Sequence, residues 1–147
     1  MLKNSLIQSN LYNYFIAQNY LEKNFITKMN IINNQERRTT VIISNINKEL
    51  TSGLINVVLE KIYNKRRTYD AIYTLREKDD NINSGICYIN FIKSEYIIDL
   101  LDNINIFNGR KECIFSWSDI QGEEFNNLMS EKKKTNIELD YIVFNDF

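Results

Sequence analysis

The order of its expected elements predicts an α+β fold of the ferredoxin-like βαββαβ class, with a four-stranded antiparallel sheet, two helices and terminal extensions. Four β-rich segments alternate with two segments of helical apolar spacing in that order. The chain has 147 residues, a length that suits one small domain with tails. Since 44% of the residues are hydrophobic, the domain can bury a core.

The first three elements are expected between residues 39 and 75. Thr39–Ile46 opens with five β-branched residues, which predicts a buried strand. Thr51 and Ser52 offer capping hydroxyls to a helix whose apolar residues recur at helical spacing over 54–62. Tyr69–Leu75 predicts the second strand.

The second half repeats this order after a polar loop. Arg76–Ser84 is expected to form the loop, and Gly85–Phe91 predicts the third strand. Ser94 is expected to cap the second helix. Asn108-Gly109 is typical of a turn, and Glu112–Ser118 predicts the fourth strand.

Composition argues against catalysis and against metal binding. The chain has no His, so it lacks the commonest general base, and its two Cys cannot make a four-ligand zinc site alone. No catalytic triad, phosphate-binding loop or metal-ligand spacing is present. We therefore expect no enzyme, no cofactor, no metal and no small-molecule substrate.

Charge and hydropathy narrow the partners and the setting. A formal net charge of −1 excludes a strongly basic, non-specific nucleic-acid binder. No apolar run is long enough for a membrane span, and the N-terminus does not read as a signal or transit peptide. The expectation is an intracellular protein, with nucleus and cytoplasm both open.

Two strand motifs point to a binding surface. Ser84-Gly85-Ile86-Cys87-Tyr88-Ile89-Asn90-Phe91 resembles the third-strand motif of an RNA recognition motif (RRM), and Val41-Ile42-Ile43-Ser44-Asn45-Ile46 resembles its first-strand motif. Strand alternation places Val41 and Ile43 inward and Ile42 and Ser44 outward, beside Tyr88. The resulting candidate RNA contacts are Ile42, Ser44, Asn45, Ile86, Tyr88 and Asn90, with Arg76, Lys78 and Arg110 as loop cations for phosphate.

The expected outward face is poor in aromatic rings, so a second function stays open. RRM sheets usually stack two or three bases on aromatic side chains, whereas only Tyr88 is aromatic here, with Ile42 and Ile86 at the other positions. Exposed Ile on a sheet suggests that something covers it. The alternative to single-stranded RNA binding is a protein-interaction RRM whose sheet is covered by a tail or by a partner peptide.

The flanking sequence gives a closer resemblance. Residues 37–46 resemble the start of the C-terminal RRM of the Mei-two-like family, the meiosis regulators of fungi and plants. Tyr69–Tyr73 and Gly85–Phe91 resemble that family's second and third strands, and Ile120-Gln121-Gly122 resembles its close after the fourth strand. The resemblance implies single-stranded RNA binding in post-transcriptional, meiotic regulation.

These motifs divide the chain into three parts. Residues 1–36 are expected to form a helical N-terminal extension, and residues 37–122 the RRM domain. Residues 123–147 are expected to form a C-terminal extension, with a polar helix and the short apolar segment Tyr141–Phe144.

Overall fold

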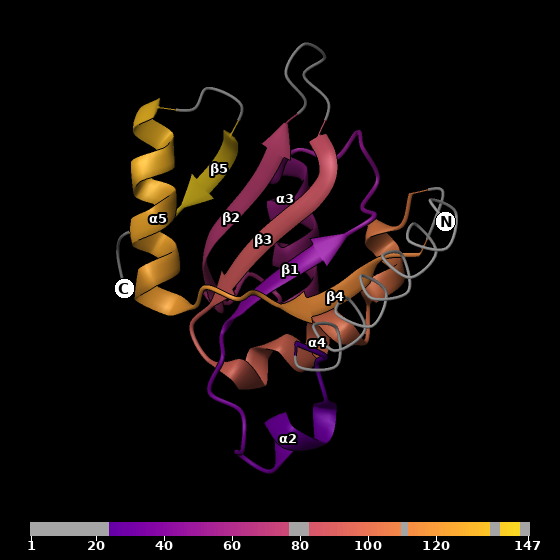
Figure 1. Cartoon of the computed structure of the whole chain (residues 1–147). Helices are drawn as coiled ribbons and strands as arrows, with labels where there is room; N and C mark the ends of the chain where they lie inside the picture. Colours follow the sequence, from indigo (N-terminus) through magenta and orange to yellow (C-terminus); the bar gives the residue numbers. More distant parts are fainter. Residues whose placement is uncertain (1–23, 77–82, 110–111, 136–138, 145–147) are drawn as a thin grey trace, which may run out of the picture.

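The computed structural model describes residues 24–76, 83–109, 112–135 and 139–144 (Figure 1). Along the chain, its helices, 3-10 turns (η) and strands are α2 (Lys28–Ile32), β1 (Thr40–Ser44), α3 (Ser52–Ile62), β2 (Tyr69–Arg76), β3 (Asn83–Phe91), η1 (Ser94–Tyr96), α4 (Ile97–Leu101), η2 (Ile104–Phe107), β4 (Ile114–Trp117), α5 (Gly122–Thr135) and β5 (Leu139–Val143).

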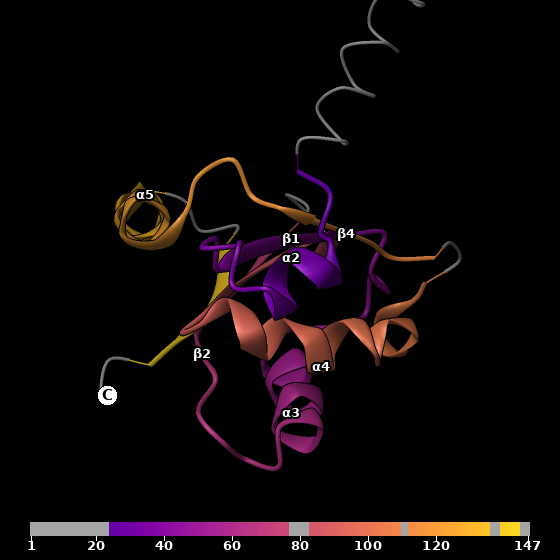
Figure 2. The same ribbon diagram turned by 90° about the horizontal axis from the view of Figure 1, so that it is seen from below.

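The strands form one antiparallel sheet in the order β4-β1-β3-β2-β5. β1 and β3 are neighbours, with Ile42 opposite Tyr88, as the motif order predicts. Figure 2 shows α3 and α4 on one face of the sheet and α5 on the other. The ferredoxin-like fold is confirmed, but the sheet has five strands instead of four. The fifth strand arises because the terminal apolar segment pairs with β2, whose edge would otherwise leave backbone groups unpaired.

The main core lies between the sheet and the pair α3 and α4. Alternate residues of β1 and β3 point into it, so the predicted inward positions are confirmed, and Trp117 at the end of β4 is fully buried there. The fully or almost fully buried side chains of this core include Val41, Ile43, Ile55, Leu59, Ile72, Cys87, Ile89, Phe91, Ile97, Leu100 and Phe107.

The two helices of the main core begin differently. α3 is capped as predicted, since the backbone N–H of Leu54 donates to Oγ1 of Thr51 at 3.1 Å. The prediction that Ser94 caps the second helix is wrong, because its hydroxyl donates to the carbonyl of Arg38 at 2.7 Å. That carbonyl lies just before β1, and the bond satisfies a backbone acceptor that is remote in sequence.

The N-terminal extension is only partly helical among the described residues. α2 is a five-residue helix whose Ile31 is buried, and Lys28 makes an ion pair with Asp102. Residues 24–26 are not helical but run beside β4. The expectation of a helix over residues 1–23 lies outside the described part of the chain.

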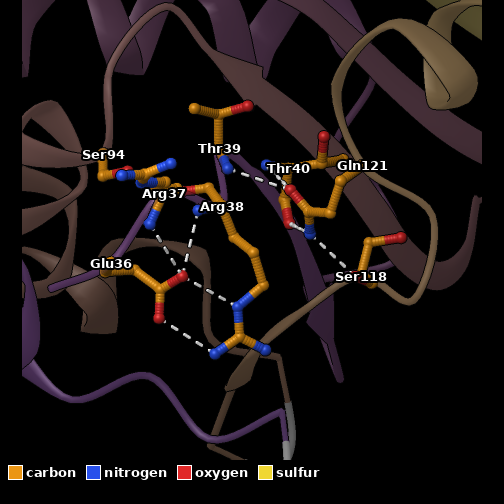
Figure 3. A network of polar contacts seen from close by, with 8 residues as sticks. All are labelled: Glu36, Arg37, Arg38, Thr39, Thr40, Ser94, Ser118 and Gln121. Atoms are coloured by element: carbon orange, nitrogen blue, oxygen red, sulfur yellow. Dashed lines mark hydrogen bonds and ion pairs between the residues drawn. The ribbon is translucent and has the colours of Figure 1, made fainter.

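One side chain, Gln121, links the end of β4 to the start of β1 (Figure 3). Its carbonyl oxygen accepts from the backbone N–H groups of Thr39 and Thr40, at 2.9 and 2.7 Å. Its amide nitrogen donates to the carbonyls of Thr40 and Ser118, at 2.8 and 2.7 Å. Gly122 then donates its N–H to Oγ1 of Thr40 at 3.0 Å and has a φ of 57°, which favours glycine. We call these contacts the Gln121 clamp, and they fix where α5 begins.

Replacing Gln121 by Ala should destabilise the fold, because the N–H groups of Thr39 and Thr40 and the carbonyls of Thr40 and Ser118 would each lose one hydrogen bond. We expect the free energy of unfolding to fall by about 2–4 kcal/mol, from about 1 kcal/mol per lost bond. Urea denaturation measures it. Gln35→Ala, at an exposed position before β1, is the matched control. Equal stability of the two variants would show that the clamp does not hold α5.

A second polar contact holds β5 against α3. The carboxylate of Asp140 accepts from the N–H of Ser52 at 2.7 Å and from the hydroxyl of Thr74 at 3.2 Å, and pairs with Arg76 at 3.2 Å. Burial alone would raise the pKa of Asp140. The Ser52 N–H and the Arg76 guanidinium outweigh it, so the pKa of this carboxyl lies below its usual value.

A lowered pKa means that Asp140 stabilises the fold above its unfolded-state pKa of about 3.9, and that this contribution disappears as the pH falls through the lower folded-state value. Asp140→Asn should therefore reduce the free energy of unfolding by about 1–3 kcal/mol at pH 7. The gap from wild type should narrow as the pH falls below the unfolded-state pKa of about 3.9. Urea titrations between pH 7 and pH 2.5 measure it, with Asp99→Asn on the exposed side of α4 as control. A gap that does not change with pH would exclude this account.

Candidate nucleic-acid interface

The face of the sheet opposite α3 and α4 presents one row of side chains across all five strands. Cross-strand pairing aligns Ser116, Ile42, Tyr88, Tyr73 and Tyr141 in that row. Since directly opposite residues of an antiparallel pair point to the same side, these five side chains share the face. The row crosses both RRM-like strands, so we look for the candidate site along it.

Helix α5 covers the β2 side of this face. Its Phe125 and Met129 are buried, and the Phe125 ring lies 5.5 Å from the Tyr73 ring and 5.3 Å from the Tyr88 ring, centre to centre. Burial raises the pKa of Tyr73 to about 12 and also raises that of Tyr88. We call Ala71, Tyr73, Tyr88 and Leu139, with the helix above them, the covered half.

Among the described residues, no helix lies over the β1 and β4 side of the face. Ser44 lies opposite Ile86 on one side and opposite Ile114 on the other, and Ile114 is 50% exposed. Ile42, Ser44 and Ile86 are half-buried. We call Ile42, Ser44, Ile86 and Ile114 the open half. It brings together three of the residues predicted as RNA contacts.

A hollow of about 770 Å³ lies at the end of the open half, where β1 leaves the sheet. It is lined by Asn45, Ile46, Asn47, Lys48, Glu49, Ser84, Gly85 and Gly109. The hydroxyl of Ser84 is buried and has no hydrogen-bond partner among the described residues. The side chain of Asn45 is exposed and donates to the carbonyl of Glu112 at 3.4 Å. The hollow therefore offers hydrogen-bonding groups beside the apolar side chains of the open half.

The structure places Asn90 inside a polar network instead of on the surface. Its side-chain oxygen accepts from the hydroxyls of Thr39 and Thr40, at 3.0 and 2.7 Å, and its amide donates to Asp70 at 2.9 Å. Burial raises the pKa of Asp70, although the bonds from Asn90 and Asn126 act in the opposite direction. Asn90 is only 4% exposed, so its predicted role in RNA contact would need this network to open.

Of the three predicted loop cations, the structure describes Arg76, which does not lie at the open half. Arg76 pairs with Asp140, whose other partners include Ser52 at the start of α3, so it lies toward the helix side of the sheet. Lys78 and Arg110 lie outside the described residues. Their roles as phosphate contacts stay predictions.

The α5 residues that pack on the covered half, Phe125 and Met129, were not predicted from the sequence. Phe125 and Met129 lie four positions apart in the segment expected to be a polar helix, and this spacing puts both on one side. The spacing was a usable signal for an apolar contact, but it could not indicate the target surface.

Neither a metal-binding cluster nor a membrane-spanning helix is present among the described residues. No group of three or more His, Cys, Asp or Glu in the described part of the chain could hold a metal ion. Within the same residues, no helix is both long and apolar enough to cross a membrane.

Comparison with known proteins identifies the domain. The RNA recognition motif 2 family matches residues 38–133. Meiosis protein mei2 of Schizosaccharomyces pombe is 30% identical over 70% of this chain, and protein MEI2-like 4 of Oryza sativa subsp. japonica is 29% identical over 71%. The chain spans only 14% and 11% of the lengths of these two relatives.

The solved structure of the Rna15 RRM with bound GU RNA aligns with a TM-score of 0.47 at 14% identity, covering 63% of this chain and 95% of that one. The family match extends from Arg38, two residues before β1, to within α5, and on this basis the chain belongs to the RNA recognition motif 2 family, the family of the Mei2-type RRM.

Proposed function

We propose that this domain binds single-stranded RNA through the open half of the sheet. The observation that carries the proposal is that no helix of the described residues lies over Ile42, Ser44 and Ile86, on the strands that hold the two RRM-like motifs, whereas α5 covers the β2 side of the face. RRM domains bind single strands on this face of the sheet.

The hollow beside the open half extends the proposed site. A base that leaves the sheet at Ser44 would reach Asn45, an exposed amide, and would lie beside Ser84, whose buried hydroxyl has no hydrogen-bond partner among the described residues. Amide and hydroxyl groups can read the hydrogen-bonding edge of an unpaired base. We propose that these side chains, together with the apolar side chains of the open half, select for single-stranded RNA.

The names of the two relatives support a finer proposal. Because both carry the mei2 name and one is described as a meiosis protein, we place the RNA binding in post-transcriptional, meiotic regulation inside the cell. The alternative function is a protein-interaction RRM. It is favoured by the covered half, where a segment of the same chain already occupies the sheet.

Ser44→Glu tests the open half directly. A carboxylate there would repel phosphate and displace bases from Ile86 and Ile114, so we expect about a tenfold or greater loss of affinity. The measurement is fluorescence anisotropy with a random single-stranded RNA pool at fixed salt. Ser130→Glu adds the same charge at an exposed position of α5 and should bind as wild type. Wild-type binding by Ser44→Glu would place the RNA elsewhere, and a wild-type protein that binds no RNA would contradict the proposed function.

The covered half supplies a test of Tyr88. If α5 competes with RNA for this ring, Phe125→Ala should loosen the helix and raise RNA affinity, and adding Tyr88→Ala should cancel the gain. Removing a buried Phe costs about 3–5 kcal/mol of stability, so thermal denaturation must accompany the binding assay. Met129→Ala is a milder change in the same cluster. Unchanged affinity in both folded variants would mean that Tyr88 is not an RNA contact.

A further inference from the structure

A short segment outside the RRM motifs extends the sheet beyond β4. The N–H of Trp117 donates to the carbonyl of Asn24 at 2.8 Å, and Phe25 forms an antiparallel bridge with Ser116. The side chain of Asn24 donates to Asp119 at 3.3 Å. We call residues 24–26 the edge segment, and these contacts fix its register against β4.

Alternation along the edge segment decides where each side chain points. Asn24 and Ile26 are 3% and 8% exposed, and Ile26 packs in the main core beneath the sheet. Phe25 lies between them and is 67% exposed. Since bridged residues share a face, the Phe25 ring lies on the same side as Ser116 and Ile42, beside the open half.

Phe25 thus adds an aromatic ring to the cross-strand row. The row now runs from Phe25 through Ser116 and Ile42 to Tyr88. With strands about 4.8 Å apart, the backbone at Phe25 lies about 10 Å from that at Ile42. The two ends of this stretch are aromatic, but α5 covers only the Tyr88 end.

We infer that Phe25 is a base-stacking residue of this domain, an inference that rests on the proposed RNA-binding function. The positions of β1 and β3 where RRM domains often carry rings hold Ile42 and Ile86, so the open half has no stacking platform of its own. The edge segment supplies one. Because its neighbours on both sides are buried, the backbone at Phe25 is held in place before RNA arrives, which lowers the entropic cost of binding.

The surroundings of the ring suit a flat base better than a protein side chain. The cross-strand neighbour of Phe25 is Ser116, a small hydroxyl residue that is itself 9% exposed, so the ring stands above its surroundings. A protruding ring offers its face to stacking, whereas a protein partner generally needs a pocket or a continuous apolar patch.

The test compares three substitutions at this position. Phe25→Leu keeps an apolar side chain but removes the π-face, and stacking on an aromatic side chain contributes about 1–3 kcal/mol per base, so affinity should fall about 5- to 150-fold. Phe25→Tyr should bind as wild type. Phe25→Trp should bind RNA, and stacking of a base should quench the fluorescence of the new indole. Trp117 is buried, so its own fluorescence should change little. Met29→Leu, at an exposed position of α2, is the control.

The outcomes separate this inference from the proposed function. If Ser44→Glu loses RNA binding while Phe25→Leu does not, the open half binds RNA and the inference about Phe25 is wrong. If the wild type binds no RNA, both fail. If Phe25→Leu leaves RNA affinity intact but abolishes self-association in sedimentation, the ring is a contact between two copies of the chain, which also overturns the inference.

Discussion

The arrangement of the binding face depends on the Gln121 clamp. β4 pairs with β1 only from Val41 onward, so the N–H groups of Thr39 and Thr40 would be left without partners on that side. The Gln121 amide takes the place of an additional strand residue by bonding to both. The chain can then turn at Gly122 and cross the sheet as α5, with its first turn tied to Thr40. Without the bonds of the Gln121 clamp, the start of α5 would not be fixed, and Phe125 would not be held against Tyr73 and Tyr88.

The clamp divides one sheet face into halves with different physical roles. In the covered half, rings and aliphatic side chains are buried under α5 and contribute to stability as a second small core. Ile114 in the open half and Phe25 in the edge segment beside it remain largely in water and contribute little to folding. A substitution at Ile114 or Phe25 therefore disturbs packing less than a substitution at Tyr88, whose ring packs against Phe125.

The sequence predicts the features that depend on local periodicity. The βαββαβ order of elements along the chain, the adjacency of β1 and β3 and the inward positions of Val41 and Ile43 follow from alternation and from motif spacing, and all three are confirmed. The course of α5, the bond from Ser94 to Arg38 and the pairing of β5 with β2 depend on contacts between distant residues. Periodicity carries no information on such partners. For the same reason, an outward position on β3 did not reveal that Asn90 would be buried in a polar network.

The placement of aromatic residues follows from this division. A ring that packs under a helix gains stability from burial, as Tyr73 and Tyr88 do. Because Tyr73 and Tyr88 pack under α5, the residues at the motif positions of β1 and β3 do not show how many aromatic rings face solvent. Ile42 and Ile86 form the floor of that surface, and the exposed ring comes from Phe25, which lies 14 residues before the first motif strand begins at Thr39 in the sequence-based prediction. Counting aromatics within the two motifs therefore underestimates what the folded face presents, because the sheet continues past β4 into a segment that the motifs do not contain.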